Sequence, residues 1–512
     1  MVTAGLMRAL DARAIEECGV PGAVLMENAG RAVFEVLLER FGPARDRRFH
    51  VVAGTGNNGG DGFVAARYLR LAGARVTLSV IGDPERIRGD AATHYALLAP
   101  LGLRPEPFSS PGSLKIDALL GTGAAGAPRQ DAAQAIRWMN ADPQPTISVD
   151  IPSGVDADTG ATPGEAVRAA VTVTFGYPKV GMLLAPGSEC CGEIVVRDIG
   201  FPWDALDVDA PCTWIVAESI RAGLRPRRRD DHKGAFGHVL IVGGSLGMSG
   251  APAMAARAAL RAGVGLVTVA APVRAQATIA SRIDEAMTLA LPEEDGALSE
   301  CAAEGVISAA SRAGSVCVGP GLGASPGARR AVGRMVRVLQ APVVLDADGL
   351  NALAEEPEML SERAGETVLT PHPGEAGRLL GRSAADVQAN RLAAVRELAA
   401  RFRAVVVLKG AGTLVCDGRA GPEVGEASAA PVAINSTGNP GMATGGSGDV
   451  LTGIIGALIA QGLDACDAAC LGVYAHGRAG DIAAARLGQV SMVAGDIIEA
   501  LPTAIRELEV DG

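Results

Sequence analysis

The hydrophobic pattern divides the chain into short apolar runs that alternate with helical stretches. Helical patterns cover residues 6–40 and 62–72. Nearly continuous apolar runs predict strands: FHVVAG, RVTLSVIG, IDALLG, TISVDIP and VTVTFG, followed by a β-rich tail, GEIVVRDIG. Because strands that alternate with helices form parallel sheets covered on both faces, this part of the chain predicts a doubly wound α/β domain.

The alternation then stops and restarts. Residues 201–214 are irregular, and residues 225–234, RPRRRDDHKG, are charged without apolar periodicity, which is typical of a solvated linker. A second series follows: GHVLIVGGS, GLVTVAAP, SVCVGPGLG, PVVLDADGL, ETVLTPHPGE and AVVVLKGAGT, then an apolar helix after Asp449. Since 512 residues are too many for one core, we expect two α/β domains, at residues 1–215 and 216–512.

Composition narrows the class of protein. The chain is 48% hydrophobic and 20% charged, with a net charge of -11, which disfavours nucleic acid or an anionic membrane as partner. No signal-peptide pattern opens it, and the longest uncharged apolar run, near residues 450–460, is too short for a bilayer. We therefore expect a cytoplasmic protein without a membrane partner. We also expect a homo-oligomer. Any polyanionic ligand must be held by local amides and single cations.

The segment GNPGMATGGSGDVLTG, residues 438–453, places one carboxylate, Asp449, between a run of small residues and an apolar helix. Small residues let backbone N–H groups approach an anion, and the helix start adds the positive end of its dipole. A phosphate fits there, and a carboxylate facing it has a role if it accepts the proton of an attacking hydroxyl. The segment predicts phosphoryl transfer to an alcohol.

Lysine is scarce, because the 46 basic residues include it only at Lys115, Lys179, Lys233 and Lys409. A retained lysine indicates a place that needs a slim, flexible ammonium rather than a guanidinium. This interpretation is favoured for Lys233 and Lys409, with chance retention as the alternative.

The first half carries polar residues where strands end. AGTGNNGGDG matches the dinucleotide fingerprint in outline at Gly54, Gly56 and Gly59, which alone is a weak signal. Oxygen ligands from Asn58, from Asp117 or Asp150 and from Ser153 could hold a monovalent or weakly bound cation at one sheet edge. Asx and Ser side chains also cap helices and turns, and for each residue singly that alternative stays open.

The second half repeats the phosphate theme without a P-loop. GxxxxGK[ST] is absent, whereas LKGAGT places Lys409 at a strand end beside backbone donors. His372, between two prolines in TPHPGE, is either a ligand contact or a turn residue.

The chain resembles the bifunctional NAD(P)H-hydrate repair enzymes, in which an epimerase domain is fused to a nucleotide-dependent dehydratase domain of ribokinase-like fold. In the first half the resemblance rests on LDARAIEE, LMENAGRAV, GTGNNGGDGFVAARYL, DALLGTGAAG, DIPSGVDADTG and TFGYPKVG. In the second it rests on HKGAFGHVLIVGGS, GMSGAPAMAARAALRAGVGLVTVA, VGPGLG, LDADGLNAL, LTPHPGE, LKGAGT and GNPGMATGGSGDVLTG. It implies an N-terminal Rossmann-like three-layer sandwich and a C-terminal ribokinase-like α/β domain.

For the epimerase domain the resemblance implies contacts to the hydrated nicotinamide nucleotide and ligands of a potassium ion. The nucleotide contacts are Asn57, Asn58, Gly59, Gly60, Asp61, Gly121, Thr122, Gly123, Ala124, Ala125, Gly126, Ala127 and Asp150. The K⁺ ligands are Asn58, Asp117 and Ser153. We take Asp150 as a candidate proton relay.

For the dehydratase domain it implies substrate positions and a nucleotide site. The substrate positions are Ala251, Gly321, Gly323, His372 and Asp449, with Ala253 as the alternative to Ala251. The positions for ADP or AMP are Lys409, Gly410, Ala411, Gly412, Thr413, Gly446 and Gly448. The implied donor is ADP, with ATP as the alternative, together with Mg²⁺.

The resemblance also implies the chemistry. The substrates are NADHX and NADPHX, which are NADH and NADPH with water added across a ring double bond. Asp449 takes the proton of the C6 hydroxyl as it attacks the terminal phosphate, phosphate then leaves, and the dihydropyridine returns, while the first domain interconverts the R and S hydrates. The alternatives are a ribokinase-type small-molecule kinase fused to a nucleotide-binding domain, which would release a phosphorylated product, and a nucleotide sensor without turnover.

Overall fold

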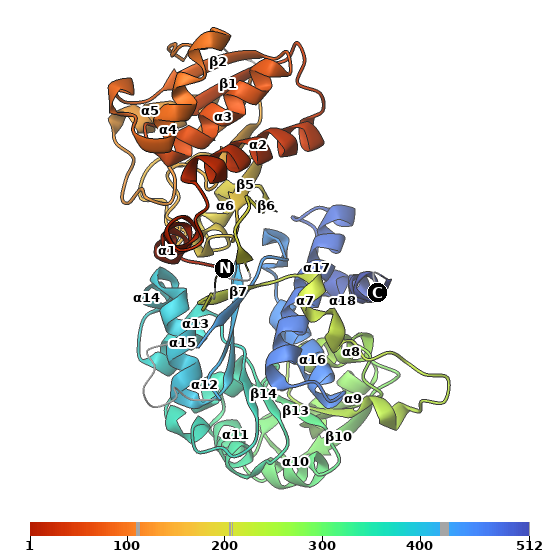
Figure 1. The fold of residues 1–512 in the computed structure, drawn as a ribbon. Coiled ribbons are helices and arrows are strands. Elements are labelled where there is room, and N and C mark those ends of the chain that lie inside the picture. The colour runs from red at the N-terminus through yellow and green to blue at the C-terminus, as the bar shows by residue number, and fades with distance from the viewer. Residues whose placement is uncertain (109–112, 204–205, 207, 420–429, 511–512) are drawn as a thin grey trace. The chain divides into compact units, whose positions relative to one another are not determined.

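The computed structural model describes residues 1–108, 113–203, 206, 208–419 and 430–510, and it separates into two compact units, Met1–Cys212 and Thr213–Gly512. Each unit is an α/β structure with a mainly parallel sheet, which confirms the predicted fold class (Figure 1). Part of the irregular segment 201–214 lies outside the described residues.

The first unit is built on a six-stranded parallel sheet. Its order, β2-β1-β3-β4-β5-β6, reverses direction between β1 and β3, the kind of switch point where doubly wound sheets bind ligands. The strands are β1 (Arg48–Ala53), β2 (Arg75–Val80), β3 (Leu114–Ala118), β4 (Thr146–Val149), β5 (Val171–Phe175) and β6 (Glu193–Arg197). The helices are α1 (Ala4–Glu16), α2 (Gly22–Phe41), α3 (Asn57–Leu71), α4 (Gly89–Ala96), α5 (Gln130–Ala141) and α6 (Ser188–Cys191).

Alternate residues of β1 enter two different cores. Phe49 and Val51 pack in a cluster with apolar residues of α2 and α3, whereas Val52 packs with Ile136 and Met139 of α5. Successive side chains of a strand point to opposite faces, so helices cover this sheet on both sides. That arrangement gives the three layers that a Rossmann-like sandwich requires.

The helical pattern predicted over residues 6–40 corresponds to two helices, α1 and α2. The break falls at Gly19, which has φ 71°, and at Pro21, which precedes α2 as its N-cap. A left-handed glycine and a proline end one helix and start the next. The β-rich tail is the sixth strand of the sheet.

The second unit contains a ten-stranded sheet, in the order β10-β9-β8-β13-β14-β15-β16-β17-β18-β7, that is parallel from β10 to β16. Its strands are β7 (Cys212–Ile215), β8 (His238–Val242), β9 (Leu266–Pro272), β10 (Met287–Leu291), β13 (Ser315–Val318), β14 (Val343–Leu345), β15 (Thr367–Leu369), β16 (Val405–Leu408), β17 (Thr413–Asp417) and β18 (Val432–Asn435). A separate two-stranded sheet joins β11 (Glu293–Glu294) and β12 (Ala297–Leu298). The sequence pattern did not predict β7, β10 or the antiparallel β17 and β18.

The helices of this unit include α16, which packs closely on α8. A Cβ on Gly453 would lie 2.0 Å from the carbonyl oxygen of Ala255, so α16 approaches α8 at a distance that only glycine allows. The helices are α7 (Ala217–Ile220), α8 (Gly250–Arg261), α9 (Val273–Ala280), α10 (Ala302–Ala310), α11 (Pro326–Val338), α12 (Asp348–Leu353), α13 (Pro373–Leu380), α14 (Ala384–Ala389), α15 (Arg391–Phe402), α16 (Ser447–Ala460), α17 (Ala465–Leu487) and α18 (Ala494–Val510).

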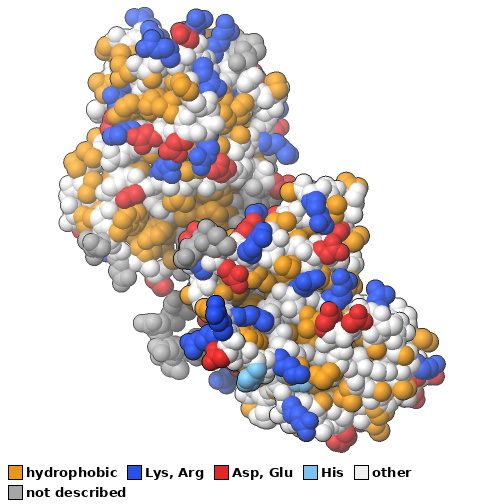
Figure 2. All heavy atoms as spheres, turned by 90° about the vertical axis from the view of Figure 1, so that its right-hand side faces the viewer, with side chains coloured by type: hydrophobic (Ala, Val, Ile, Leu, Met, Phe, Trp, Pro, Cys, Tyr) orange, Lys and Arg blue, Asp and Glu red, His pale blue; other side chains and the backbone are white. Residues whose placement is uncertain are grey.

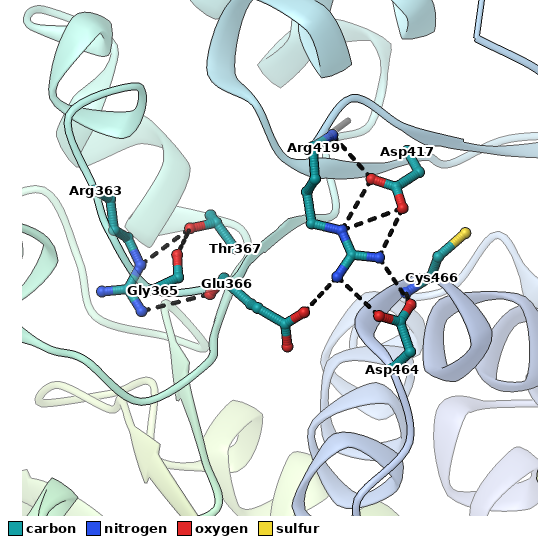
Figure 3. Close-up of polar contacts among 8 residues, drawn as sticks. All are labelled: Arg363, Gly365, Glu366, Thr367, Asp417, Arg419, Asp464 and Cys466. Carbon is teal, nitrogen blue, oxygen red and sulfur yellow. Dashed lines mark hydrogen bonds and ion pairs between the residues drawn. The ribbon is translucent and has the colours of Figure 1, made fainter. Parts of the chain in front are cut away.

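Arginine side chains form ion pairs and hydrogen bonds at one end of this sheet, the end opposite the glycine-rich loops. Arg419, just after β17, bonds to Asp417 at 2.7 Å and to Asp464, the N-cap of α17, at 2.8 Å, and it also pairs with Glu366 ahead of β15 (Figure 3). Arg363 donates to carbonyl groups around the end of α11. Such forked contacts suit guanidinium groups, in keeping with the preference for arginine.

None of the helices in the described part of the chain has both the length and the apolar composition that crossing a bilayer requires. On the face drawn in Figure 2, acidic and basic side chains are interspersed.

Candidate active sites

The loop that follows β1 is shaped by glycines that pack against neighbouring backbone. A Cβ on Gly54 would lie 2.1 Å from the carbonyl oxygen of Leu119, and one on Gly59 would lie 2.1 Å from that of Gly54. Helix α3 begins at Asn57, with Gly56 as an N-cap that has no capping side chain. The first turn, which contains Asn57 to Gly60, therefore offers backbone donors and a helix N-terminus to an anion.

A cluster of oxygen atoms lies where β3 and β4 end. Asp117 is fully buried and accepts hydrogen bonds from the Ser153 hydroxyl at 2.6 Å, the Ser153 N–H at 2.9 Å and the Ser148 hydroxyl at 2.8 Å. Asn58 donates to the Leu120 carbonyl at 3.0 Å, and the Leu120 N–H donates to Ser153 at 2.8 Å. The three predicted metal ligands thus come together, although these bonds are also the kind that the capping alternative predicts.

The donor set suits a potassium ion. Burial raises the pKa of the Asp117 carboxyl, and within the described residues no cationic side chain pairs with it. An oxygen-only set with one buried carboxylate matches a hard monovalent cation, which would compensate that charge.

Asp150 lies beside a lysine that the site prediction omitted. Its backbone has φ 65°, and its side chain forms an ion pair with the buried ammonium of Lys179, while the Thr174 hydroxyl donates to it at 3.2 Å. Asp61 and Asp11 interact electrostatically with the same pair. The sequence-based site prediction missed Lys179 and Asp11. Lys179 could have been noticed as one of only four lysines, whereas nothing marked Asp11 apart from its place in LDARAIEE.

The loop after β3 forms one wall of a shallow hollow. Gly121, Ala124 and Gly126 line it together with Ile151 and Pro152. The rest of this loop, Thr122, Gly123, Ala125 and Ala127, is half-buried or exposed. The predicted contacts from Gly121 to Ala127 therefore lie next to the strand end that carries Asp150.

In the second unit, Asp449 lies in the first turn of α16, which begins at Ser447 and not after the aspartate. The N-cap Gly446 is left-handed, with φ 94°, and a Cβ there would lie 2.3 Å from Met254 Cε. Burial, helped by the charge of Asp346, raises the pKa of Asp449 to about 7, although the Lys409 ammonium opposes the shift. Asp449 can therefore gain and lose a proton near neutrality.

The ammonium of Lys409 points into a group of carboxylates. It lies 2.6 Å from Asp346 Oδ1 and 3.8 Å from Glu375 Oε2, and Asp346, which is 1% exposed, also accepts from Thr452 at 2.8 Å. Despite its burial, the ammonium and the Thr452 hydroxyl hold the pKa of Asp346 below its usual range. Lys409, at the end of β16, is thus linked through Asp346 to Thr452 of α16. Asp346 is a site residue that the sequence analysis missed.

The predicted substrate positions gather around the ends of β13 and β15. A Cβ on Gly321 would lie 3.2 Å from Ala251 Cβ, whereas Ala253 is 2% exposed and belongs to the core, which favours Ala251 as the residue facing the site. The Gly323 N–H donates to Asp348 at 2.8 Å. His372 caps α13 through Nδ1, which accepts from the Gly374 N–H at 2.9 Å, and its side chain is half exposed. His372 is thus the N-cap of α13, and part of its ring stays exposed.

A buried arginine donates hydrogen bonds to the backbone of the loop after β16. Arg391 donates to the carbonyl groups of Leu408, Lys409 and Ala411, and burial lowers its pKa to about 10. The Thr413 hydroxyl donates to the Gly410 carbonyl at 2.9 Å, so Gly410 to Thr413 form a tight loop with an exposed tip. A Cβ on Gly448 would lie 3.2 Å from Lys409 Nζ, which brings the nucleotide positions and the carboxylate group together.

The carboxylates of this site do not form a ready-made divalent metal site. In the described ranges, no group of three or more His, Cys, Asp or Glu side chains has metal-binding geometry. A divalent ion here would therefore be held mainly by nucleotide phosphates, with one or two carboxylates, as Mg²⁺ usually is.

Two family models match the chain. The model described as NAD(P)H-hydrate dehydratase matches residues 239–503, and the model described as YjeF-related protein N-terminus matches residues 22–181.

Relatives match both halves together. The bifunctional NAD(P)H-hydrate repair enzyme Nnr of Moorella thermoacetica is 42% identical over 99% of this chain and 97% of its own length. The Escherichia coli enzyme of the same name is 39% identical over 93% of this chain and 88% of its own. A solved structure, the ADP/ATP-dependent NAD(P)H-hydrate dehydratase of Bacillus subtilis with ATP and Mg²⁺, has a TM-score of 0.49 and 29% identity, covering 58% of this chain and 99% of that one.

Proposed function

The chain belongs to the bifunctional NAD(P)H-hydrate repair enzymes, and on that premise we propose that it restores hydrated NADH and NADPH in two steps. Residues 1–215 interconvert the R and S hydrates, and residues 216–512 dehydrate the S hydrate with ADP as phosphoryl donor, releasing AMP and phosphate. The observation that carries the second step is the position of Asp449, a carboxyl with a pKa of about 7 in the first turn of α16.

Dehydration begins with proton transfer to Asp449. As the C6 hydroxyl oxygen attacks the terminal phosphorus of ADP, Asp449 takes its proton, and the glycine-rich start of α16 stabilises the charge on the phosphoryl oxygens. The nitrogen lone pair then forms a double bond to C6 as the C6–O bond breaks and phosphate leaves with the electron pair of that bond. Loss of a proton from C5 restores the dihydropyridine. Lys409 lies next to Asp449 and offsets the charge of Asp346 and Glu375, which keeps a base available at neutral pH.

The nucleotide and its metal ion find suitable partners here. Lys409, Gly410, Ala411, Gly412, Thr413, Gly446 and Gly448 form the proposed site for ADP, while Ala251, Gly321, Gly323 and His372 line the side proposed for the hydrate. Mg²⁺, when bound, would neutralise phosphate charge, and Asp348 is the carboxylate available to it.

In the first unit, the proposed nucleotide contacts are Asn57 to Asp61, Gly121 to Ala127 and Asp150, and Asn58, Asp117 and Ser153 would hold K⁺. That ion would order the loops after β1, β3 and β4 around the substrate. The cytoplasmic location and the homo-oligomer stay predictions from the sequence.

The test of this function is turnover of the hydrates. Purified protein with ADP is expected to regenerate the near-ultraviolet absorbance of NADH from a mixture of R and S hydrates to completion. With ATP in place of ADP the rate should be lower, and without nucleotide it should be absent. Release of a stable phosphorylated nucleotide instead of NADH would favour the kinase alternative, and binding without turnover would favour the sensor.

The pH dependence of dehydration follows from Asp449. A base must be deprotonated to act, and the pKa of Asp449 is about 7, so kcat/KM for the S hydrate is expected to rise with pH through about 7 and level off above it. Initial rates between pH 5.5 and about 9 with saturating ADP test this expectation. A flat profile from pH 6 to about 8 contradicts it.

Potassium should act on epimerisation alone. Replacing K⁺ by tetramethylammonium is expected to lower both the thermal midpoint of the first unit and the rate of epimerisation. Asn58→Ala should remove this K⁺ dependence by taking away one oxygen ligand. The K⁺-dependent thermal shift is measured without substrate, and an equal shift in Asn58→Ala and the parent protein would argue against the site.

A further inference from the structure

One buried ammonium lies among three carboxylates at the carboxyl edge of the first sheet. Lys179 is 1% exposed, and its Nζ donates to Asp150 Oδ1, to Thr174 Oγ1 at 2.9 Å and to the Phe175 carbonyl at 3.3 Å. An ammonium has three donor hydrogens, so this one is fully satisfied inside the unit and does not reach solvent. Its contacts fix Asp150 in place.

The N-terminal residues hold the backbone of this lysine. Val2 donates to the Pro178 carbonyl at 3.1 Å and accepts from the Val180 N–H at 3.1 Å, one residue to either side of Lys179. Helix α1 starts two residues later and carries Asp11 into the same electrostatic group. The position of Lys179 is thus built by β5, by the segment after it and by the chain start.

The carboxyls of the group divide into two kinds. Asp150 is the carboxylate that the ammonium contacts, and its side chain is 15% exposed. Burial, with the charges of Asp150 and Asp11, raises the pKa of Asp61 well above its ordinary value, and burial raises that of Asp11 to about 6. The site thus contains an ion-paired carboxylate beside a carboxyl whose charged form is disfavoured by burial, and environments that differ in this way separate base from acid.

We propose that Lys179 is the positioning residue of the epimerase site, holding Asp150 as the base on one side of the hydrate ring while Asp61 supplies a proton on the other. This proposal rests on the epimerase function proposed above. It gives Asp61 a defined role and adds a residue that the predicted contacts did not include.

The chemistry of the hydrate is such that one acid and one base are enough for epimerisation at C6. Its C6 carries the hydroxyl and is bonded to the ring nitrogen, so the C6–O bond breaks as the nitrogen lone pair forms a double bond to C6. Asp61 gives its proton to the departing oxygen, which leaves as water. A water molecule then adds to the opposite face of C6, and Asp150 takes its proton. Proton exchange with solvent resets both groups, and no oxidant or reductant is needed.

The test compares two buried lysines of the first unit. Lys179→Met is expected to lower epimerisation at pH 7 by at least about 10-fold and to move the acidic limb of its pH profile upward by about one unit or more, since Asp150 loses its cation. Lys179→Arg should keep the limb near its original position. The control is Lys115→Met, because Lys115 is also fully buried and pairs with Asp142 at 3.4 Å, but at the other end of β3. This variant should lose stability without moving the limb.

An unshifted limb in a folded Lys179→Met protein overturns the proposal. If that variant does not fold, as judged by the thermal transition of the first unit, Asp61→Asn decides. This nearly isosteric change should lower epimerisation by about 10²-fold or more, the range for one general acid, and a retained rate refutes the proposal. If the parent protein does not interconvert the hydrates above the rate without enzyme, the epimerase function itself fails.

Discussion

Asp449→Asn is expected to lower ADP-dependent dehydration of the S hydrate by about 10²–10⁴-fold, the range for loss of a general base. The amide is nearly the same size but does not take the proton of the attacking hydroxyl. Epimerisation, which belongs to the other unit, should be unchanged. Binding of ADP should be unchanged or tighter, because a negative charge that faces the phosphates is removed. Rates with separated hydrates and titration calorimetry with ADP measure the two effects.

Asp467→Asn is the matched control for this variant. Asp467 is the third residue of α17, as Asp449 is of α16, but it is exposed. The same substitution at the same helix position should leave dehydration within about 2-fold of the parent rate, since exposed positions near a helix start contribute little. Equal losses in both variants would mean that replacing an aspartate at a helix start perturbs the second unit in general, which would contradict the assignment of Asp449 as the base.

Among these variants, Asp346→Ala should lower the stability of the second unit most. Asp346 is 1% exposed and bonds to Lys409 at 2.6 Å and to Thr452 at 2.8 Å, so its removal takes away the shortest ion pair of the ammonium and leaves Glu375 at 3.8 Å. Breaking a buried ion pair from one side typically costs about 3–5 kcal/mol. We expect the thermal transition of the second unit to fall accordingly and dehydration to be lost, with epimerisation retained.

Arg330→Gln is the control for this variant, because it breaks an exposed ion pair whose N–O distance equals that of the buried pair between Lys409 and Asp346. Arg330 and Glu300 lie 2.6 Å apart, and both side chains are more than half exposed. Such pairs contribute about 0–1 kcal/mol because water screens them. Calorimetry should therefore separate the two variants clearly. Similar small losses in both would show that Asp346 and Lys409 do not form the buried link described here.

Parallel strands were the most predictable part of this molecule. Buried parallel strands are nearly continuous in apolar residues, so FHVVAG and GHVLIVGGS could be recognised without partners. The edge strand β10 was missed because a half-exposed strand leaves a weaker pattern, and the antiparallel strands β17 and β18 were missed as well. The helical pattern over residues 6–40 did not reveal the break between α1 and α2, because apolar periodicity continues on both sides of Gly19 and Pro21.

The predicted site residues came from loops with unusual composition, and the missed ones from ordinary positions. Asp449 follows a glycine-rich segment that predicts a phosphate site. Asp346 also follows a strand, but several other aspartates do so as well, and nothing in the sequence distinguishes it from them. Lys179 and Asp11 are far apart in the chain, and only the fold brings them into one electrostatic group. Sequence spacing cannot supply that proximity.

In the proposed dehydration, phosphate is a leaving group made from the C6 hydroxyl. An S hydrate labelled with oxygen-18 at that hydroxyl, dehydrated with unlabelled ADP, is expected to yield inorganic phosphate that carries the label, one atom per NADH formed. Mass spectrometry of the released phosphate gives the answer. Label found in water, with unlabelled phosphate, would mean that the hydroxyl leaves without attacking phosphorus, which contradicts the proposed role of Asp449.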